Sequence, residues 1–312
     1  MRRDFRIFAL AGIGLTAACA TVPAPGDPAV PVYAVAETQP VVTANEDAAV
    51  YDLRGQPKSF TAHAALNNVD LVDMGDQGIV VFASDRSDLA QARIALFRLD
   101  TASGSLVELG SVTSGPGEAY GICGTRRGDR LIVYTAPKSG RIGEWEITLS
   151  DTPTARELRT MQVPSQPEGC AVDHRDGTLY IGEEAAGIWR FRSGAAAGEL
   201  VAAVDGRKIV ADLEGLALVP EGDEGGWLYA SSQGDNTYMR YALPDVTPAG
   251  RFRIAAGQYG STEETDGIEA QRGDFGPSFP GGLFIAQDGV NDGRAQNFKL
   301  VPLGAIEKAL GD

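Results

Sequence analysis

The sequence predicts an all-β protein, namely a six-bladed β-propeller with an incomplete first blade. A short strand that opens with an acidic residue or tyrosine before glycine recurs, with its glycines at 121, 169, 215 and 267, in steps of 48, 46 and 52 residues. A nearly fixed period of this size indicates a repeat architecture. The 39 glycines and 17 prolines among 312 residues fit many short strands joined by tight turns.

Two further strands are expected after each glycine. The second strands are predicted at residues 80–83, 131–134, 179–182, 228–231 and 283–286. The third strands occur six times, at residues 50–53, 96–99, 144–147, 188–191, 238–241 and 297–300. In a propeller the first strand of each blade lines the central channel, so the acidic turns should converge at one mouth of that channel.

The first blade is short of residues. Residues 49–53 form the first clear strand, and residues 67–71 open the next blade. Either the run at residues 33–43 or the C-terminus is expected to complete the first blade. Residues 105–112 should form an edge strand, and residues 303–310 should form the only helix.

The N-terminus resembles an export signal. Three arginines within the first six residues precede an apolar run at residues 7–18 and then Cys19. This run is too short for a stable membrane anchor. Residues 15–19 (Leu-Thr-Ala-Ala-Cys) resemble a bacterial lipobox with Thr16 where leucine is usual, so the signal is either that of a lipoprotein or a plain cleaved one. We therefore expect a periplasmic, outer-membrane-anchored or secreted protein.

Three segments are predicted. Residues 1–18 are the signal peptide, residues 19–36 are a tether rich in proline and alanine, and residues 37–312 are the propeller. A lipid on Cys19 would be the only membrane contact. We expect a monomer.

The charge and the cysteines limit the function further. A formal net charge of −15 argues against nucleic acid as a partner. Cys123 lies two residues after its glycine and Cys170 one residue after its own, so strand alternation should point them to opposite faces. We expect buried free thiols, although export would permit a disulfide.

The sequence lacks the residue patterns that several kinds of catalysis require. The two histidines, His63 and His174, belong to no zinc-ligand pattern and no nucleophile elbow. The sequence also has no phosphate-cradling P-loop. Catalysis by a histidine, a serine triad or a zinc ion is therefore not expected.

Oxygen ligands recur at corresponding strand ends. They are Asp70, Glu168, Glu184, Asp212, Glu214, Gln233, Asp266 and Asp288. Clustered carboxylates repel one another unless a cation joins them, and a set made only of oxygen atoms favours Ca²⁺. Arg86, Lys138 and Arg141 lie on the matching loops, where they could bind phosphate. For any one acidic residue before glycine, a role in the turn is the alternative, and Tyr120 is either a packing residue or a ligand.

These residues resemble the β-propeller phytases, the alkaline, calcium-dependent hydrolases of myo-inositol hexakisphosphate. The resemblance covers about residues 37–312. Its motifs include residues 67–71 (Asn-Asn-Val-Asp-Leu), 84–87 (Ser-Asp-Arg-Ser), 120–121 (Tyr-Gly), 168–169 (Glu-Gly), 179–189, 212–216 (Asp-Leu-Glu-Gly-Leu), 230–234, 265–268 (Thr-Asp-Gly-Ile), 282–289 and 296–299.

The resemblance implies roles for these side chains in releasing phosphate from phytate, as a 3-phytase does. The residues expected to hold or flank several catalytic Ca²⁺ ions are Tyr120, Glu168, Glu184, Asp212, Glu214, Gln233 and Asp266, and we add Asp288 as a metal ligand. Arg86 and Lys138 would bind substrate phosphate and act with Glu168 and Glu184 in catalysis, while Arg141 and Tyr120 would be further substrate contacts. A calcium-bound water would attack phosphorus without a covalent enzyme intermediate.

The sequence departs from this family near its start. The family's Asp-Ala-Asp-Asp-Pro-Ala-Ile-Trp segment is missing after residues 37–41 (Glu-Thr-Gln-Pro-Val). Glu46 and Asp47 stand where a basic residue is expected, and Ser139 replaces an acid. The loss of carboxylates should weaken the metal cluster. Two functions therefore remain, a phytase with reduced activity or a catalytically weak or inactive propeller that binds phosphate and calcium. A sugar-lactone hydrolase would leave the basic loop residues unexplained.

Overall fold

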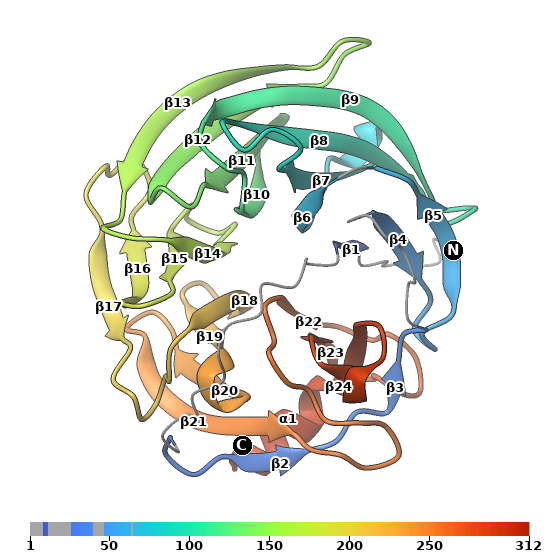
Figure 1. Cartoon of the computed structure of the whole chain (residues 1–312), viewed down its shortest axis with the longest axis vertical. Coiled ribbons are helices and arrows are strands. Elements are labelled where there is room, and N and C mark those ends of the chain that lie inside the picture. The colour runs from blue at the N-terminus through green and yellow to red at the C-terminus, as the bar shows by residue number, and fades with distance from the viewer. Residues whose placement is uncertain (1–8, 12–25, 40–46, 64, 312) are drawn as a thin grey trace.

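Antiparallel sheets are arranged in a ring in the computed structural model, which describes residues 9–11, 26–39, 47–63 and 65–311 (Figure 1). Among these residues, five sheets contain four or five strands and a sixth contains three. The predicted β-propeller is confirmed, with five complete blades.

Four of the five complete blades contain four consecutive antiparallel strands, starting at the channel. They are β6 (Leu66–Asp73), β7 (Ile79–Asp85), β8 (Gln91–Asp100) and β9 (Ser105–Pro116); β10 (Gly121–Arg127), β11 (Arg130–Ala136), β12 (Arg141–Thr148) and β13 (Thr154–Gln162); β14 (Pro167–Val172), β15 (Leu179–Glu183), β16 (Gly187–Phe191) and β17 (Glu199–Ala203); and β18 (Leu213–Glu221), β19 (Gly225–Ser232), β20 (Thr237–Ala242) and β21 (Thr247–Ile254). The last blade has three of its strands from one stretch, β22 (Ile268–Arg272), β23 (Gly282–Asp288) and β24 (Asn297–Pro302).

The chain's early strands close the ring. β3 (Ala36–Glu37) pairs with β24 and gives the last blade its fourth strand, while β2 (Val30–Val32) adds a parallel strand to β21. Buried Lys299 joins this closure, because its Nζ lies 2.9 Å from Glu37 Oε2. The segment assigned to the tether therefore contains strand structure.

The first blade is the three-stranded sheet. Its β4 (Ala48–Tyr51) pairs with β5 (Pro57–Thr61) on one side and with β1 (Ala9–Ala11) on the other. The expectation that residues 33–43 or the C-terminus complete this blade is wrong for the described residues, because β3 belongs to the last blade and the C-terminal residues form a helix. β1 lies inside the predicted signal peptide, and residues 40–43 are outside the described part.

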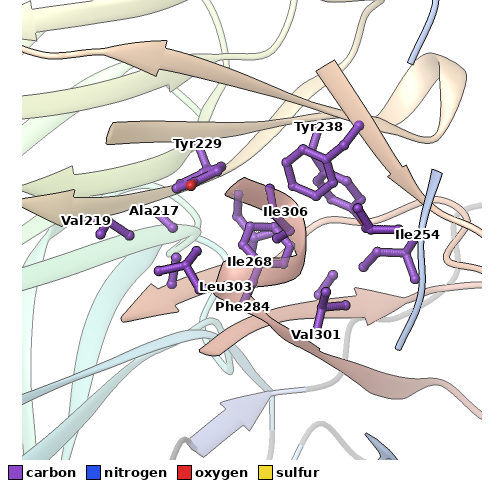
Figure 2. Close-up of a cluster of buried hydrophobic side chains, with 14 of the residues drawn as sticks. Ala217, Val219, Tyr229, Tyr238, Ile254, Ile268, Phe284, Val301, Leu303 and Ile306 are labelled. Atoms are coloured by element: carbon purple, nitrogen blue, oxygen red, sulfur yellow. The ribbon is translucent and has the colours of Figure 1, made fainter. Parts of the chain in front are cut away.

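The hydrophobic core lies between neighbouring blades. Figure 2 shows one such cluster, where Tyr229 of one blade meets Phe284 of the next with ring centroids 5.5 Å apart. A second interface is so close that a Cβ atom on Gly124 would lie 2.5 Å from Cζ of Phe82 in the preceding blade. Blade-to-blade burial of apolar surface thus fixes the positions of the inner strands.

The predicted C-terminal helix is confirmed as α1 (Leu303–Leu310). It buries Leu303 and Ile306 against the same cluster. Gly311 ends the helix in the left-handed conformation, and its N–H donates to the carbonyl oxygens of Glu307 and Lys308. No helix in the described part of the chain has the length and apolar character needed to cross a membrane.

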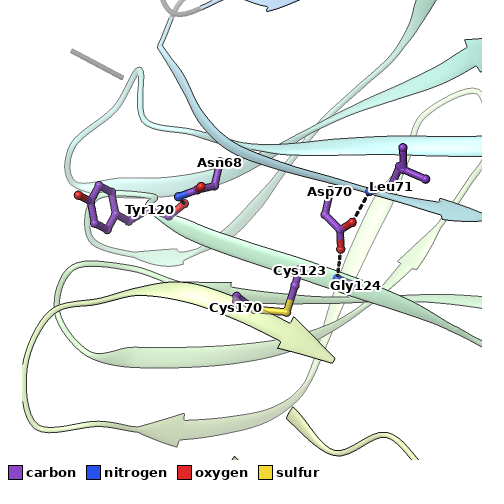
Figure 3. Close-up of a disulfide and its surroundings, with 7 residues drawn as sticks. All are labelled: Asn68, Asp70, Leu71, Tyr120, Cys123, Gly124 and Cys170. Carbon is purple, nitrogen blue, oxygen red and sulfur yellow. Dashed lines mark hydrogen bonds between the residues drawn. A yellow bond between two sulfur atoms is a disulfide. The ribbon is translucent and has the colours of Figure 1, made fainter. Parts of the chain in front are cut away.

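Cys123 and Cys170 form a disulfide between β10 and β14, the inner strands of successive blades (Figure 3). The expectation of free thiols is therefore wrong. Strand alternation can send the two side chains to opposite faces of their own sheets. In a propeller, however, opposite faces of successive sheets meet in one interface, and the Cα atoms of the two cysteines lie 5.4 Å apart there.

Candidate active site

All five inner strands of the complete blades start at the same end of the channel. Their walls enclose a cavity of about 580 Å³, lined by residues of β6, β10, β14, β18 and β22. The repeated acidic turns stand at the starts of these strands, because the chain enters each blade there. The fold therefore gathers residues that lie about fifty positions apart in sequence.

Three glutamates form the centre of this acidic group. Glu168 begins β14, Glu214 begins β18, and Glu184 follows β15; one oxygen atom from each lies within 4.8 Å of the other two. Glu168 is only 2% exposed and Glu214 only 4%. Oε2 of Glu168 and Oε2 of Glu214 are buried without a hydrogen-bond partner. Two buried carboxylate oxygens in this state are unfavourable unless a cation or a proton binds them.

Amide side chains orient two of these glutamates. Nδ2 of Asn68 donates to Oε1 of Glu168 at 2.8 Å, and Nδ2 of Asn67 approaches the same atom at 3.4 Å. Nε2 of Gln166 donates to Oε1 of Glu184 at 2.6 Å. The pKa of Glu184 is raised to about 7, mainly by burial and also by the charges of Glu168 and Asp212, while the hydrogen bond from Gln166 opposes this rise.

Gln233, in the same blade as Glu214, and Asp266, in the next blade, extend the group. Nε2 of Gln233 donates to Oδ1 of Asp266 at 2.6 Å. Burial, followed by the charge of Glu168, raises the pKa of Asp266 to about 8. Burial and the charges of Glu168 and Glu184 likewise raise the pKa of Glu214. The fold therefore brings together the predicted set of Glu168, Glu184, Asp212, Glu214, Gln233 and Asp266.

Tyr120 and two cations stand beside the carboxylates. Burial and the charges of Glu168 and Glu214 raise the pKa of the Tyr120 phenol. Nζ of Lys138 lies 4.6 Å from the centre of the Tyr120 ring. Lys138 and Arg86 share one carboxylate, that of Glu118, at 3.0 Å and 3.6 Å. The predicted phosphate-binding pair is thus convergent and adjoins the acidic group.

Three predicted site residues lie elsewhere. Asp288 pairs with buried Lys299 at 3.0 Å, inside the last blade. Arg141 pairs with Glu157 on the outer strand β13. Asp70 lies deeper in the channel, where its carboxylate accepts hydrogen bonds from the N–H groups of Leu71 and Gly124 (Figure 3) and burial raises its pKa to about 6. Partners contributed by other strands account for these positions.

The sequence matches the family described as phytase over residues 2–312. This chain belongs to the phytase family. Over 310 residues it is 32% identical to the 3-phytase of Bacillus subtilis (strain 168), covering 92% of the chain and 81% of that relative. A solved structure of a functionally unknown protein from Desulfotomaculum acetoxidans is 17% identical, with a TM-score of 0.48 over 69% of this chain and 66% of that one.

The donor set of this phytase-family protein fits calcium. Its candidate ligand atoms are carboxylate, amide and phenol oxygens, which hard cations prefer. The unpartnered oxygens of Glu168 and Glu214 are the observation that indicates a cation, since hydrogen bonding does not satisfy them. The acidic group is thus a candidate metal site.

Sequence reasoning missed the residues that orient this site. Asn67 and Asn68 enter the sequence prediction only within a motif, and neither Gln166 nor Glu118 belongs to the predicted site. The available signal was position, since Glu118 lies two residues before Tyr120 and Gln166 two residues before Glu168.

Proposed function

We propose that this protein releases phosphate from myo-inositol hexakisphosphate in a calcium-dependent reaction, as a 3-phytase does. The pair of buried, unpartnered carboxylate oxygens on Glu168 and Glu214 carries the proposal, because a cation held by them would lie beside Lys138 and Arg86. Membership of the phytase family supports it.

The residues divide into two groups by charge. Glu168, Glu184 and Glu214 would hold calcium, with Tyr120, Asp212, Gln233 and Asp266 around them. Calcium bound there would neutralise negative charge on the carboxylates and the substrate, and it would activate water for attack on phosphorus.

The protein's own cations orient the substrate. Lys138 Nζ and the Arg86 guanidinium would donate hydrogen bonds to oxygens of the phosphate that is released. Asn68 and Gln166 hold Glu168 and Glu184 in place. Lys138 and Arg86 would therefore position the phosphate, and the three glutamates would position the metal.

A second candidate is a catalytically weak or inactive propeller that binds phosphate and calcium. One observation favours it: Asp47, near the expected basic residue, accepts a hydrogen bond from the N–H of His63 at 2.7 Å within the first blade. Asp47 therefore makes a structural contact within the first blade and offers the substrate no basic group. Residues 40–46 lie outside the described part of the chain.

Phosphate release from phytate, measured while calcium is titrated, separates the two candidates. We expect release that requires calcium and is lost in Asp266→Ala, while Glu199→Gln, a change of an exposed carboxylate on β17, keeps wild-type activity. Phytate binding without release at saturating calcium would favour the binding module instead.

We also propose that the protein is exported and acts as a monomer. The N-terminal pattern supports export, and so does the disulfide, since disulfides persist in oxidising compartments. Labelling with a radioactive fatty acid, compared between wild type and Cys19→Ser, would test lipidation. Light scattering after gel filtration would test the monomer.

A further inference from the structure

Glu118 lies between the two cations of the phosphate site. Its Oε1 atom is 3.0 Å from Nζ of Lys138 and 3.6 Å from Nη1 of Arg86. Arg86 follows β7 in one blade and Lys138 follows β11 in the next. A single carboxylate therefore joins two blades at the rim of the acidic group.

Several contacts fix this arrangement. The backbone N–H of Lys138 points to the carbonyl oxygen of Glu118 at 3.4 Å, and the ammonium group lies over the Tyr120 ring. The three charged side chains are partly accessible, with exposed fractions of 24% for Glu118, 32% for Lys138 and 15% for Arg86. A ligand arriving from solvent can therefore reach the cations.

A carboxylate oxygen held by an ammonium and a guanidinium has the same surroundings as an oxygen of bound phosphate. We propose that Glu118 is a positioning residue: it keeps Lys138 and Arg86 convergent in the substrate-free protein and yields them to the phosphate on binding. This inference rests on the proposed function and adds Glu118 to its site.

The Glu118→Gln variant tests two effects of the carboxylate, one on phosphate affinity and one on kcat. Loss of the negative charge removes the competitor for the cations, so inorganic phosphate should bind about threefold more tightly in the presence of calcium. Loss of the two ion pairs removes the shared contact that draws the cations together, so kcat for phytate should fall about tenfold without a rise in KM. Calcium affinity and melting temperature should stay close to wild type.

Isothermal titration with inorganic phosphate tests the first effect. Glu108→Gln, the same change at an exposed position on β9, is the matched control and should leave phosphate affinity unchanged. Unchanged or weaker phosphate binding in Glu118→Gln would overturn the proposal. This titration decides the point even if the wild type fails to hydrolyse phytate, which would defeat only the proposed function.

A double-mutant cycle tests whether Glu118 acts through Lys138. In the Lys138→Ala background, Glu118→Gln should lower kcat by no more than about threefold, because one of its two partners is already gone. An equal loss of kcat in both backgrounds would show that Glu118 acts elsewhere and would refute its positioning role.

Discussion

Nδ2 of Asn68 lies 2.8 Å from Oε1 of Glu168, although the two residues are 100 positions apart in the sequence. The bond crosses from β6 to β14, past the blade that lies between them. Glu168 keeps its other oxygen without a partner. Asn68 thus holds one oxygen of the Glu168 carboxylate and leaves the other oxygen available to a cation.

Asn68→Ala should therefore weaken calcium binding about tenfold, since groups that orient metal ligands have effects of this size. Calorimetric titration of the calcium-free protein would measure it. Gln56→Ala, which removes an exposed amide from the turn before β5, is the control and should bind as wild type does. Equal affinities in all three proteins would contradict a role for Asn68 in orienting Glu168.

The raised pKa values predict how stability depends on pH. Burial raises the pKa of Asp266 from 3.8 to about 8 and that of Glu184 from 4.5 to about 7. In this interval the folded, calcium-free protein binds more protons than the unfolded chain, so its free energy of unfolding falls as pH rises.

In EDTA, the melting temperature should thus fall by roughly 5 °C between about pH 5 and about pH 8. Calcium should reduce this slope, because it binds the ionised carboxylates and displaces their protons. Scanning calorimetry across this range, with and without calcium, would measure both. A melting temperature that rises with pH in EDTA would contradict the assignment.

The two arginines predicted to contact the substrate, Arg86 and Arg141, should differ in their effect on kcat/KM. Arg86→Ala and Lys138→Ala should each lower kcat/KM for phytate by roughly tenfold or more, since each removes a charged hydrogen-bond donor. Arg141→Ala should change it less than about threefold, because this arginine is held by Glu157 and Thr160 on β13. Steady-state kinetics at saturating calcium would show the contrast, and an equal loss in all three variants would restore Arg141 to the site.

The disulfide closes a loop with a sequence separation of 47. Its loss in Cys123→Ala/Cys170→Ala should lower the free energy of unfolding by about 4 kcal/mol. The melting temperature should then fall by roughly 10 °C. Thermal unfolding would measure this, and alkylation followed by mass spectrometry would check that the wild type has neither thiol free. A wild type that reacts at both cysteines would refute the link.

Much of the fold is predictable because the second and third strands of the blades are short, mainly apolar segments. All six third strands and the five second strands lie where the sequence indicates them, in β4, β8, β12, β16, β20 and β24 and in β7, β11, β15, β19 and β23. The sequence does not predict the outer strands β13, β17 and β21. Strand β13 shows why: it is largely exposed and its sequence is mostly polar, so it carries little periodic signal.

The site was predictable where position alone decides it. Glu168, Glu214 and Asp266 stand at equivalent strand starts, so the repeat brings them together. Asp288 and Arg141 stand at comparable strand ends, but each meets an opposite charge on a neighbouring strand. A repeat period gives the place of a residue within its blade, and it does not give the partner that the next strand offers.

The closure by β2 and β3 constrains when the molecule can be completed. Residues 30–37 are translated near the beginning, yet their partners β21 and β24 are translated near the end. Blades in the middle can form from consecutive strands while synthesis continues. The seam between the first and last blades must wait for nearly the whole chain. Until β21 and β24 have been made, β2 and β3 have no partner, so the nascent protein carries two unpaired strands through most of its synthesis.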